Sequence, residues 1–574
     1  MVQLQEQSQP QTASRKLVVR RGVPYVLATI AVIWTTSFAR IDYDRIHDGA
    51  MLSPAIAVHS GLHVHADVMS GYGPVTPWLQ SLFLYLPLSP ALALRAGTVL
   101  TIGLIVFLLA DFGRIRPTRS PIGYSTGLMA SISWLVVSDI WLTGPMRPWS
   151  SLVAQLGIVL TAYLAHRGWR CVEVHRHRCA EVLLGGSGYV FGLAVFARVG
   201  MGFFFVLAAA MCSICVFWVS RRGRTLWLMA VIGFTLAVIT VVLALLVTSS
   251  LGPFVRDAVT WPLNYFSADS SAFTGFFASV VAVYLIPVSV GIASLFAIRR
   301  MNLASRRGSY SVFAALCAGL CILGTTVVVA RLALASTTVV TYWTSWRALM
   351  LLFAAAAVAA LGTFLYSGWR LASGRRRGAR LVAWYCLAVF AGASLMEIVP
   401  DYNGRHAWWS LPLGLLLIFS LIPWATRTGR ILANPLVVPM LAFGAYAIFA
   451  SFNNLSAHRV AAPEDSIAAG MLVQEDVRAA LLEDRDLLAR TMVDGKGVFM
   501  TVTGDLAVLQ GSYASIDPFF TCWGPLPDLS VRLQALPTIV VDPTESACPS
   551  LGGLADWGYL YIDGNDRLDV YQHP

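Results

Sequence analysis

Residues 40–78 read RIDYDRIHDGAMLSPAIAVHSGLHVHADVMSGYGPVTPW and follow directly on the first long apolar run of the chain. This stretch concentrates charge where the neighbouring sequence has almost none: it holds four carboxylates and four histidines, and it ends in the rigid turn Gly71-Tyr72-Gly73-Pro74. Charged groups beside a bilayer are costly and therefore tend to have a function. We interpret residues 42–78 as a functional loop at a membrane surface, held there by the rest of the chain.

The composition is that of a membrane protein. Of the 574 residues, 57% are hydrophobic and only 12% are charged, with a mean hydropathy of +0.67. A soluble protein carries about 25% charged residues. Apolar runs of about 17 to 25 residues, long enough to cross a hydrocarbon core, recur through most of the chain. We therefore expect a polytopic α-helical membrane protein. The net charge of +11 is no sign of nucleic-acid binding, because most arginines lie in short loops between apolar runs.

The loops alternate strictly between two kinds. Basic loops at 114–119, 166–178, 221–224, 299–307, 369–380 and 427–430 separate loops with few basic residues at 42–78, 139–149, 198–202, 251–271, 335–345 and 397–409. Placing the basic loops in the cytoplasm gives about thirteen spans, with the N-terminus inside and the C-terminus outside. The predicted spans are 23–41, 91–110, 121–138, 150–166, 180–197, 201–219, 226–248, 273–298, 310–334, 346–367, 381–398, 410–425 and 433–451.

Three segments need separate interpretation. Residues 1–22 are predicted to form a basic cytoplasmic tail, and the run that follows is predicted to be an uncleaved helix rather than a signal peptide, because it is longer than a usual signal core. The transmembrane domain then covers 23–451, with a first outer loop at 42–90. Within that loop Val75–Leu88 is too short and too Pro-bounded for a full span, so we expect an interfacial or re-entrant segment.

Residues 452–574 have a different composition and predict a small extracytoplasmic α/β domain. Ser466–Arg490 has the pattern of an amphipathic helix. Strand-like runs follow at Val498–Val502, Thr538–Val541, Tyr559–Ile562 and Leu568–Tyr571, the last two flanking a predicted hairpin turn at 563–566. Cys522 and Cys548 lie in this domain and are candidates for a disulfide in an oxidising compartment.

Nearly all carboxylates of the membrane region lie on the predicted outer side, which points to chemistry there. Asp48 precedes a predicted helix, Ala50–His59, that ends at Gly61. A carboxylate at a helix start is favoured and held in place, and it is suited to accept a proton from a sugar hydroxyl as a general base. Asp44 is a second catalytic candidate, and His47 either shares the role or binds an anion.

Later parts of the loop are candidates for substrate binding, through Asp67 and Tyr72. The i, i+2, i+4 spacing of His63, His65 and Asp67 would also suit a metal site on a strand, although ordinary loop residues are the simpler interpretation. Arg256, in a later outer loop, is a candidate for binding a phosphate.

A second polar group occurs in the outer loop 397–409. Arg405 and His406 are candidates for phosphate binding, because arginine pairs with phosphate through two parallel hydrogen bonds. Asp401 and Trp408 are candidates for contact with a sugar ring. The alternative for the tryptophans is an aromatic belt at the membrane interface.

The order of these elements resembles the C-type glycosyltransferases. These are polytopic enzymes that use polyprenyl-phosphate sugars, and they include the dolichyl-phosphate-mannose–protein mannosyltransferases and the aminoarabinose transferases. Members of this family have an acidic pair after the first helix and Lys-Pro-Pro further on. Here His47-Asp48 stands in the place of the pair and Tyr72-Gly73-Pro74 in the place of the later element. A subset of bacterial polysaccharide-biosynthesis membrane proteins is similar in having His-Glu/Asp-Gly followed by Tyr-Gly-Pro.

The resemblance implies transfer of a sugar from a polyprenyl-phosphate donor to a glycan, lipid or protein acceptor of the cell envelope, at the outer face of a bacterial inner membrane. It leaves Asp48 as the base, and a divalent cation (Mg or Mn) stays open as a cofactor. Two alternatives are a polysaccharide polymerase or ligase of the O-antigen type and a lipid-linked sugar flippase. The large first outer loop and the C-terminal domain speak against the former. The scarcity of carboxylates at span centres and the lack of an internal repeat speak against the latter.

Overall fold

The structure is a computed structural model. It describes residues 9–45, 47–68, 70–113, 124–138, 146–219, 221–260, 359–371, 379–396, 404–421, 454–491, 498–500, 538–541 and 558–573, and in addition residues 353, 356, 357, 449, 451, 452 and 554.

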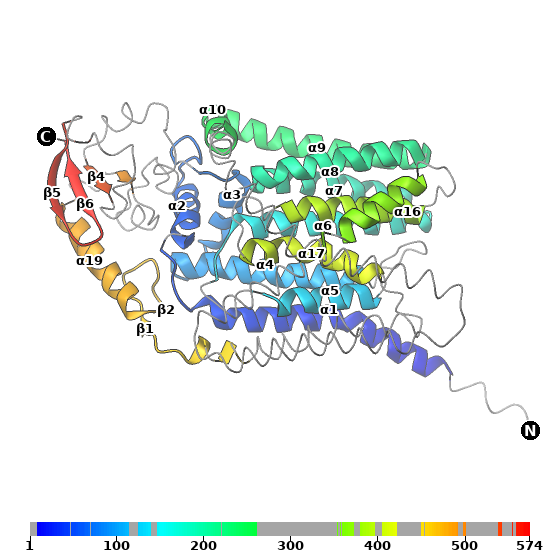
Figure 1. Ribbon diagram of the computed structural model, residues 1–574, viewed down its shortest axis with the longest axis horizontal. Helices are drawn as coiled ribbons and strands as arrows, with labels where there is room; N and C mark the ends of the chain where they lie inside the picture. Colours follow the sequence, from blue (N-terminus) through cyan, green and yellow to red (C-terminus); the bar gives the residue numbers. More distant parts are fainter. Residues whose placement is uncertain are drawn as a thin grey trace, which may run out of the picture.

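A bundle of long apolar helices forms the body of the molecule (Figure 1). In the described part of the chain, five helices are long and apolar enough to cross a membrane: α1 (Gln9–Ala39), α4 (Pro90–Phe112), α7 (His177–Ala197), α8 (Val199–Val219) and α9 (Arg221–Val247). Packed with them are α5 (Tyr124–Val136), α6 (Ser150–Glu173), α16 (Ala379–Leu395) and α17 (Gly404–Leu421). The chain is therefore an α-helical membrane protein.

The predicted spans fall on these helices wherever the structure describes them. Nine of the predicted spans each overlap one of the nine helices above, and 346–367 overlaps the helical residues 359–371. The predicted spans 273–298 and 310–334, and nearly all of 433–451, lie outside the described residues, so the total of thirteen spans stays a prediction.

Two short helices, α2 (His47–His59) and α3 (Val75–Phe83), occupy the first loop. The structure ends α2 as the sequence predicts: Gly61 has φ 87°, and the amides of Gly61 and Leu62 donate to the carbonyls of Val58 and Ala57, which is the usual glycine-based helix end. The start differs, because α2 begins at His47 and not at Ala50. With nine residues, or about 14 Å, α3 is too short to cross a bilayer.

The α3 helix is fixed to the bundle through its polar side chains. Thr76 Oγ1 donates to the carbonyl of Ala197 at 2.9 Å and Gln80 Nε2 donates to that of Pro148 at 2.6 Å, whereas Leu79 and Leu82 on its other side are exposed. This arrangement suits a helix that lies at an interface with its apolar side toward lipid.

The C-terminal part contains α19 (Glu475–Thr491) and two small sheets. Strands β1 (Val460–Ala461) and β2 (Leu472–Val473) pair antiparallel. A four-stranded sheet has the order β3-β4-β6-β5, from β3 (Val498–Met500), β4 (Thr538–Val541), β6 (Asp569–Gln572) and β5 (Leu560–Gly564). Its strands coincide with the predicted ones to within two residues. The predicted helix 466–490 is wrong in its first part, because Gly470 turns the chain with φ 77° and β2 follows before α19 begins.

This C-terminal sheet and α19 lie at the end of the bundle that also carries α2, α3, α10 (Leu251–Val255) and the adjoining π-helical turn η2 (Arg256–Thr260); the beginning of α1 is at the opposite end (Figure 1). The loop 40–48 therefore lies between the membrane-spanning bundle and the C-terminal segment.

Candidate active site

Asp44 and Asp48 share the start of α2 in a reciprocal arrangement. Asp44 Oδ1 accepts the backbone N–H of His47 at 3.1 Å, and Asp48 Oδ2 accepts the backbone N–H of Asp44 at 2.9 Å. Each carboxylate thus satisfies an amide of the first turn, which an isolated helix leaves without a partner. A carboxylate does cap this helix, as predicted, but it is that of Asp44. The predicted residue, Asp48, lies inside the first turn.

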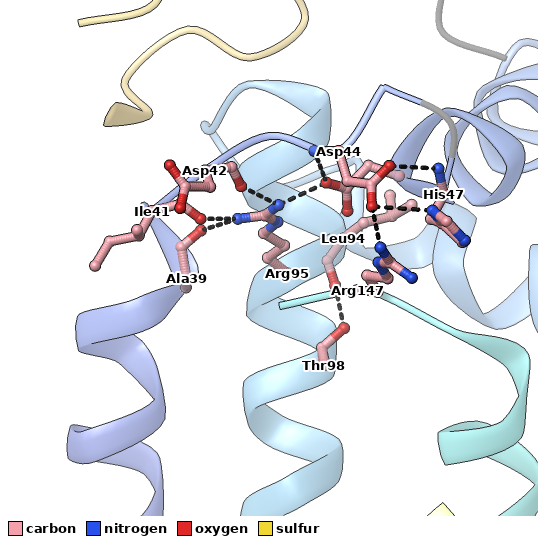
Figure 2. A network of polar contacts seen from close by, with 10 residues as sticks. Ala39, Ile41, Asp42, Asp44, His47, Leu94, Arg95, Thr98 and Arg147 are labelled. Carbon is pink, nitrogen blue, oxygen red and sulfur yellow. Dashed lines mark hydrogen bonds and ion pairs between the residues drawn. The ribbon is translucent and has the colours of Figure 1, made fainter. Parts of the chain in front are cut away.

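Asp48 is paired with a buried arginine of α4, Arg95, and Figure 2 shows this arginine among the residues that end α1 and begin the loop. Arg95 donates to Asp48 Oδ2 at 2.5 Å, and it also donates to the carbonyls of Ala39, Ile41 and Asp42 at 3.2, 2.8 and 2.5 Å. The side chain of Asp48 is 3% exposed and that of Arg95 is fully buried. Burial raises the pKa of Asp48, and the ion pair with Arg95 only opposes that rise. Asp48 is therefore the counter-ion of a structural arginine.

Asp44 lies on the accessible side of the same turn (Figure 2). Its Oδ2 contacts His47 Nδ1 at 2.9 Å and forms an ion pair with Arg147 from the segment before α6. Burial by itself would raise the pKa of Asp44, but the hydrogen bonds from His47 and the charge of Arg147 hold it well below its usual value. Asp44 is thus ionised at any physiological pH, and its side chain stays 14% exposed.

Aromatic rings line the protein beside this pair. The ring of Trp149 lies 5.4 Å from that of His47 and 5.4 Å, edge-on, from that of Tyr72, and it stacks on Trp409 of α17 at 6.1 Å. The guanidinium of Arg198 lies over Tyr72 at 5.4 Å, a cation–π contact. The indole Nε1 of Trp149 is buried and has no hydrogen-bond partner among the described residues. Tyr72, a predicted substrate contact, therefore lies in the same group as His47.

Trp408 does not join this group. It stacks on Trp134 of α5 at 5.0 Å, and each indole N–H donates to the other residue's carbonyl, at 3.0 and 2.9 Å. Only 2% of Trp408 is exposed. The Trp408 side chain thus joins two helices in the interior, whereas its neighbour Trp409 stacks on Trp149; the predicted sugar contact of Trp408 has no support from this position.

Arg256 lies at a second place on the same end of the bundle, in η2. Its Nε donates to Asp257 Oδ1 at 2.6 Å, and Asp257 Oδ2 lies 3.7 Å from Nδ1 of the buried His65. The ring of His65 packs edge-on against Phe254. Arg256 is 32% exposed at its side chain, so its remaining donors face outward.

The predicted metal spacing does not converge in space. Asp67 closes a turn by accepting the backbone N–H of His63 at 2.7 Å, and His65, with φ 72°, turns to Asp257 instead. Asp67 is thus placed as a turn residue, and its predicted substrate contact has no support from its position.

A divalent cation does not fit the carboxylates of the site. No three His, Cys, Asp or Glu side chains converge within the described ranges. Asp44 and Asp48 each face a guanidinium, which repels a cation. The chemistry below is therefore derived without Mg or Mn.

Two predicted donor-binding residues are placed by their backbone alone. Arg405 and His406 lie in the first turn of α17, one turn before Trp409, and their side chains are outside the described part of the chain. Asp401, Cys522 and Cys548 also lie outside the described residues.

The sequence interpretation missed Arg95, Arg147 and Trp149. Arg95 had a usable signal: it is the one charged residue among the first twenty-one of α4, and a charge in an apolar span requires a partner. Arg147 and Trp149 lie in a loop without such a signal, and only the fold shows that this loop reaches Asp44.

No protein-family model and no curated protein matches the sequence. Among solved structures, the chain is similar to ArnT from Cupriavidus metallidurans in the apo state, with 12% sequence identity, coverage of 98% of each chain and a TM-score of 0.40.

Proposed function

We propose that this protein is a membrane glycosyltransferase that moves a sugar from a polyprenyl-phosphate donor to an acceptor hydroxyl of a cell-envelope glycan, lipid or protein on the outer face of a bacterial inner membrane. The N-terminus lies in the cytoplasm and the C-terminal domain outside. The observation that carries the proposal is the Asp44–His47 pair, at the end of the bundle away from the start of α1, beside the aromatic rings of Trp149 and Tyr72.

The geometry favours His47 over Asp48 as the proton acceptor. Asp48 is buried and committed to Arg95. Asp44 is ionised but has too low a pKa to be an effective base. His47 donates Nδ1–H to Asp44, which orients the ring and leaves Nε2 as the acceptor. The His47 side chain is 27% exposed, so a hydroxyl group can reach it.

In the proposed reaction the acceptor oxygen attacks the anomeric carbon of the donor. A glycosidic C–O bond forms, the bond from the anomeric carbon to the phosphate oxygen breaks, and the hydroxyl proton passes to His47 Nε2. The leaving group is a polyprenyl phosphate. Asp44 stabilises the protonated imidazole through its negative charge. Tyr72 is partly exposed and offers an aromatic ring of the kind that packs against a sugar, and the buried Trp149 packs against both Tyr72 and His47.

Basic groups at the same end of the bundle are suited to bind the donor phosphate. Arg256 presents exposed donors at η2. Arg405 and His406 belong to the first turn of α17, where the free amides and the helix dipole also favour an anion. We assign these three residues to the phosphate, and Asp401 in the preceding segment to the sugar.

The test is transfer of labelled sugar by the purified protein, in liposomes, from a panel of synthetic polyprenyl-phosphate hexoses and pentoses to envelope extracts. We expect His47→Gln and Asp44→Asn to lower kcat by about 100-fold or more, the usual contribution of general-base catalysis. Asp48→Asn should retain activity within about tenfold, because its role is structural. His63→Gln is a matched control from the same loop.

An active His47→Gln variant would remove the proposed base, and an inactive Asp48→Asn variant that folds normally would return the role to Asp48. Envelope glycans and lipid-linked sugars of a strain that lacks the gene separate the alternatives. Loss of one sugar from the glycans with accumulation of the polyprenyl-phosphate sugar fits a transferase, shortened polymers fit a polymerase, and donors trapped on the cytoplasmic side fit a flippase.

A further inference from the structure

The loop that carries the Asp44–His47 pair is joined to the C-terminal segment by backbone hydrogen bonds. Leu472 of β2 donates its N–H to the carbonyl of Arg40 at 2.7 Å and accepts the N–H of Asp42 at 2.8 Å. Arg40 Nε also donates to the carbonyl of Gly470 at 3.0 Å. The chain leaving α1 is thus attached to β2 as a short additional strand.

The side chain of Asp42 reinforces this attachment. Arg459 donates Nε–H to Asp42 Oδ1 and Nη2–H to Asp42 Oδ2, both at 2.8 Å, which is the two-bond geometry that arginine favours. Arg459 is itself held by Asn454, through its side-chain and backbone oxygens. Asp42 has φ 49°, a left-handed conformation that is uncommon for residues other than glycine, although aspartate adopts it more readily than most. The ion pair with Arg459 is one of the contacts that fix Asp42 there.

A second ion pair fixes the loop on the other side of Asp44. Arg45 donates to Asp484 Oδ2 of α19 at 2.5 Å. The other oxygen of Asp484 accepts from Asn565 at 3.0 Å and from Arg567 at 3.2 Å. The side chain of Asp484 is 1% exposed, so this is a buried and fully used carboxylate, whose loss leaves charges without partners.

We propose that Arg459 and Asp484 are positioning residues that set the place of the Asp44–His47 pair, so that the C-terminal segment is a working part of the active site. This inference rests on the function proposed above. Asp44 lies between Asp42 and Arg45 in the sequence, and consecutive Cα atoms are about 3.8 Å apart. A shift of either anchor therefore moves Asp44, and an error of about 1 Å in a catalytic group can lower the rate by about 100-fold.

The proposal is distinct from a general contribution to stability. Arg95 of α4 already ties Ala39, Ile41 and Asp42 to the bundle (Figure 2). These hydrogen bonds do not depend on the C-terminal segment. Removal of Arg459 or Asp484 is thus expected to loosen the loop on one side and leave the bundle folded.

The experiment uses the full-length protein with either of two changes, Arg459→Ala or Asp484→Asn. The second is isosteric and milder, so it still tests the proposal if Arg459→Ala fails to fold. Arg485→Ala is the matched control, because Arg485 pairs at the surface with Asp465 and Asp486 in the same segment and makes no hydrogen bond or ion pair with the described residues of the loop. We expect both test variants to lower kcat about 10- to 100-fold with KM for the lipid donor changed less than about threefold. Hydrogen exchange of amides 42–48 should be at least about tenfold faster.

A double-mutant cycle separates positioning from stability. If Arg459 acts through the pair, Arg459→Ala added to Asp44→Asn should lower the residual rate by less than about twofold. Fully additive losses, an unchanged kcat, or unchanged exchange of amides 42–48 would each overturn the proposal. Failure of the proposed function is recognised separately, because the wild type would then transfer no sugar. Faster exchange of amides 42–48 in Arg459→Ala would still show that Arg459 holds the loop in place.

Discussion

Replacing Arg95 with methionine tests how the loop is built. Arg95 is fully buried, and it donates to Asp48 and to three carbonyls at the end of α1. Methionine fills a similar volume without a charge, so the variant removes these hydrogen bonds and leaves little cavity. The carboxylate of Asp48 then stays buried without its counter-ion.

The structure allows the magnitude to be estimated. Removing one partner of a buried ion pair costs about 3 to 5 kcal/mol, because the remaining charge is not compensated. The carbonyls of Ala39, Ile41 and Asp42 add to this cost unless water reaches them. Asp48→Asn in the same chain removes the stranded charge, so Arg95→Met with Asp48→Asn should recover about 2 kcal/mol or more of the loss. The single Asp48→Asn change should cost less than Arg95→Met, because the asparagine oxygen can still accept the hydrogen bond from Arg95, although the guanidinium loses its counter-ion.

The assay is hydrogen exchange of amides 41–48 in the detergent-solubilised protein. A local loss of about 3 to 5 kcal/mol corresponds to exchange about 100- to 4,000-fold faster, at about 1.4 kcal/mol for each factor of ten. The double variant should exchange at least about tenfold more slowly than Arg95→Met. Equal exchange in the two variants would refute the reasoning, because it would show that Asp48 carries no buried charge to be relieved.

Two further predictions concern the same end of the bundle. Gly73→Ala is expected to abolish most of the folded protein, because an added Cβ would overlap the backbone carbonyl of Phe196. The measurement is the yield of monodisperse protein in detergent. Gly200→Ala is the control, since its Cβ meets nothing within 4 Å. Acid should destabilise the loop through Asp44, because the pKa of this carboxyl is lower in the folded state than in the unfolded state. Its contribution to the free energy of unfolding is therefore complete above the unfolded-state pKa, about 4. That contribution is lost as the pH falls from this value toward the folded-state pKa. The protection of amides 42–48, taken relative to the intrinsic exchange rate at each pH, should therefore fall between pH 5 and pH 3 in the wild type and fall less in Asp44→Asn.

Much of the fold was predictable because apolar length and turn residues act locally. The described spans fall on helices, Gly61 ends α2, and β4 has the predicted bounds Thr538–Val541. The predicted helix 466–490 is wrong in its first part, where buried residues recur at helical spacing although the chain forms no helix. Ile467 and Met471 are 8% and 0% exposed and sit at helical spacing, yet they belong to a turn and its exit. The tertiary contacts of that turn override the pattern.

The sequence interpretation and the proposed mechanism place the site in the same loop, but they give the leading role to different residues: the former to Asp48, the latter to His47 beside Asp44. Asp44 and Asp48 both suit a helix start, and local rules do not separate them. What separates them is distant in sequence: Arg95 takes Asp48 into the interior, and Arg147 and Arg459 secure the outer side of the loop. A single sequence does not show which residues of these distant segments come into contact.

The role of Asp48 follows from what the end of α1 requires. The carbonyls of Ala39, Ile41 and Asp42 converge on one point inside the bundle, and buried carbonyls need donors. Only arginine offers enough donors from one side chain, and a buried guanidinium requires an anion beside it. Asp48 meets that requirement, so its charge is already assigned to structure. The proton transfer we propose is then left to the neighbouring Asp44–His47 pair, which shares the same helix start but faces the accessible side.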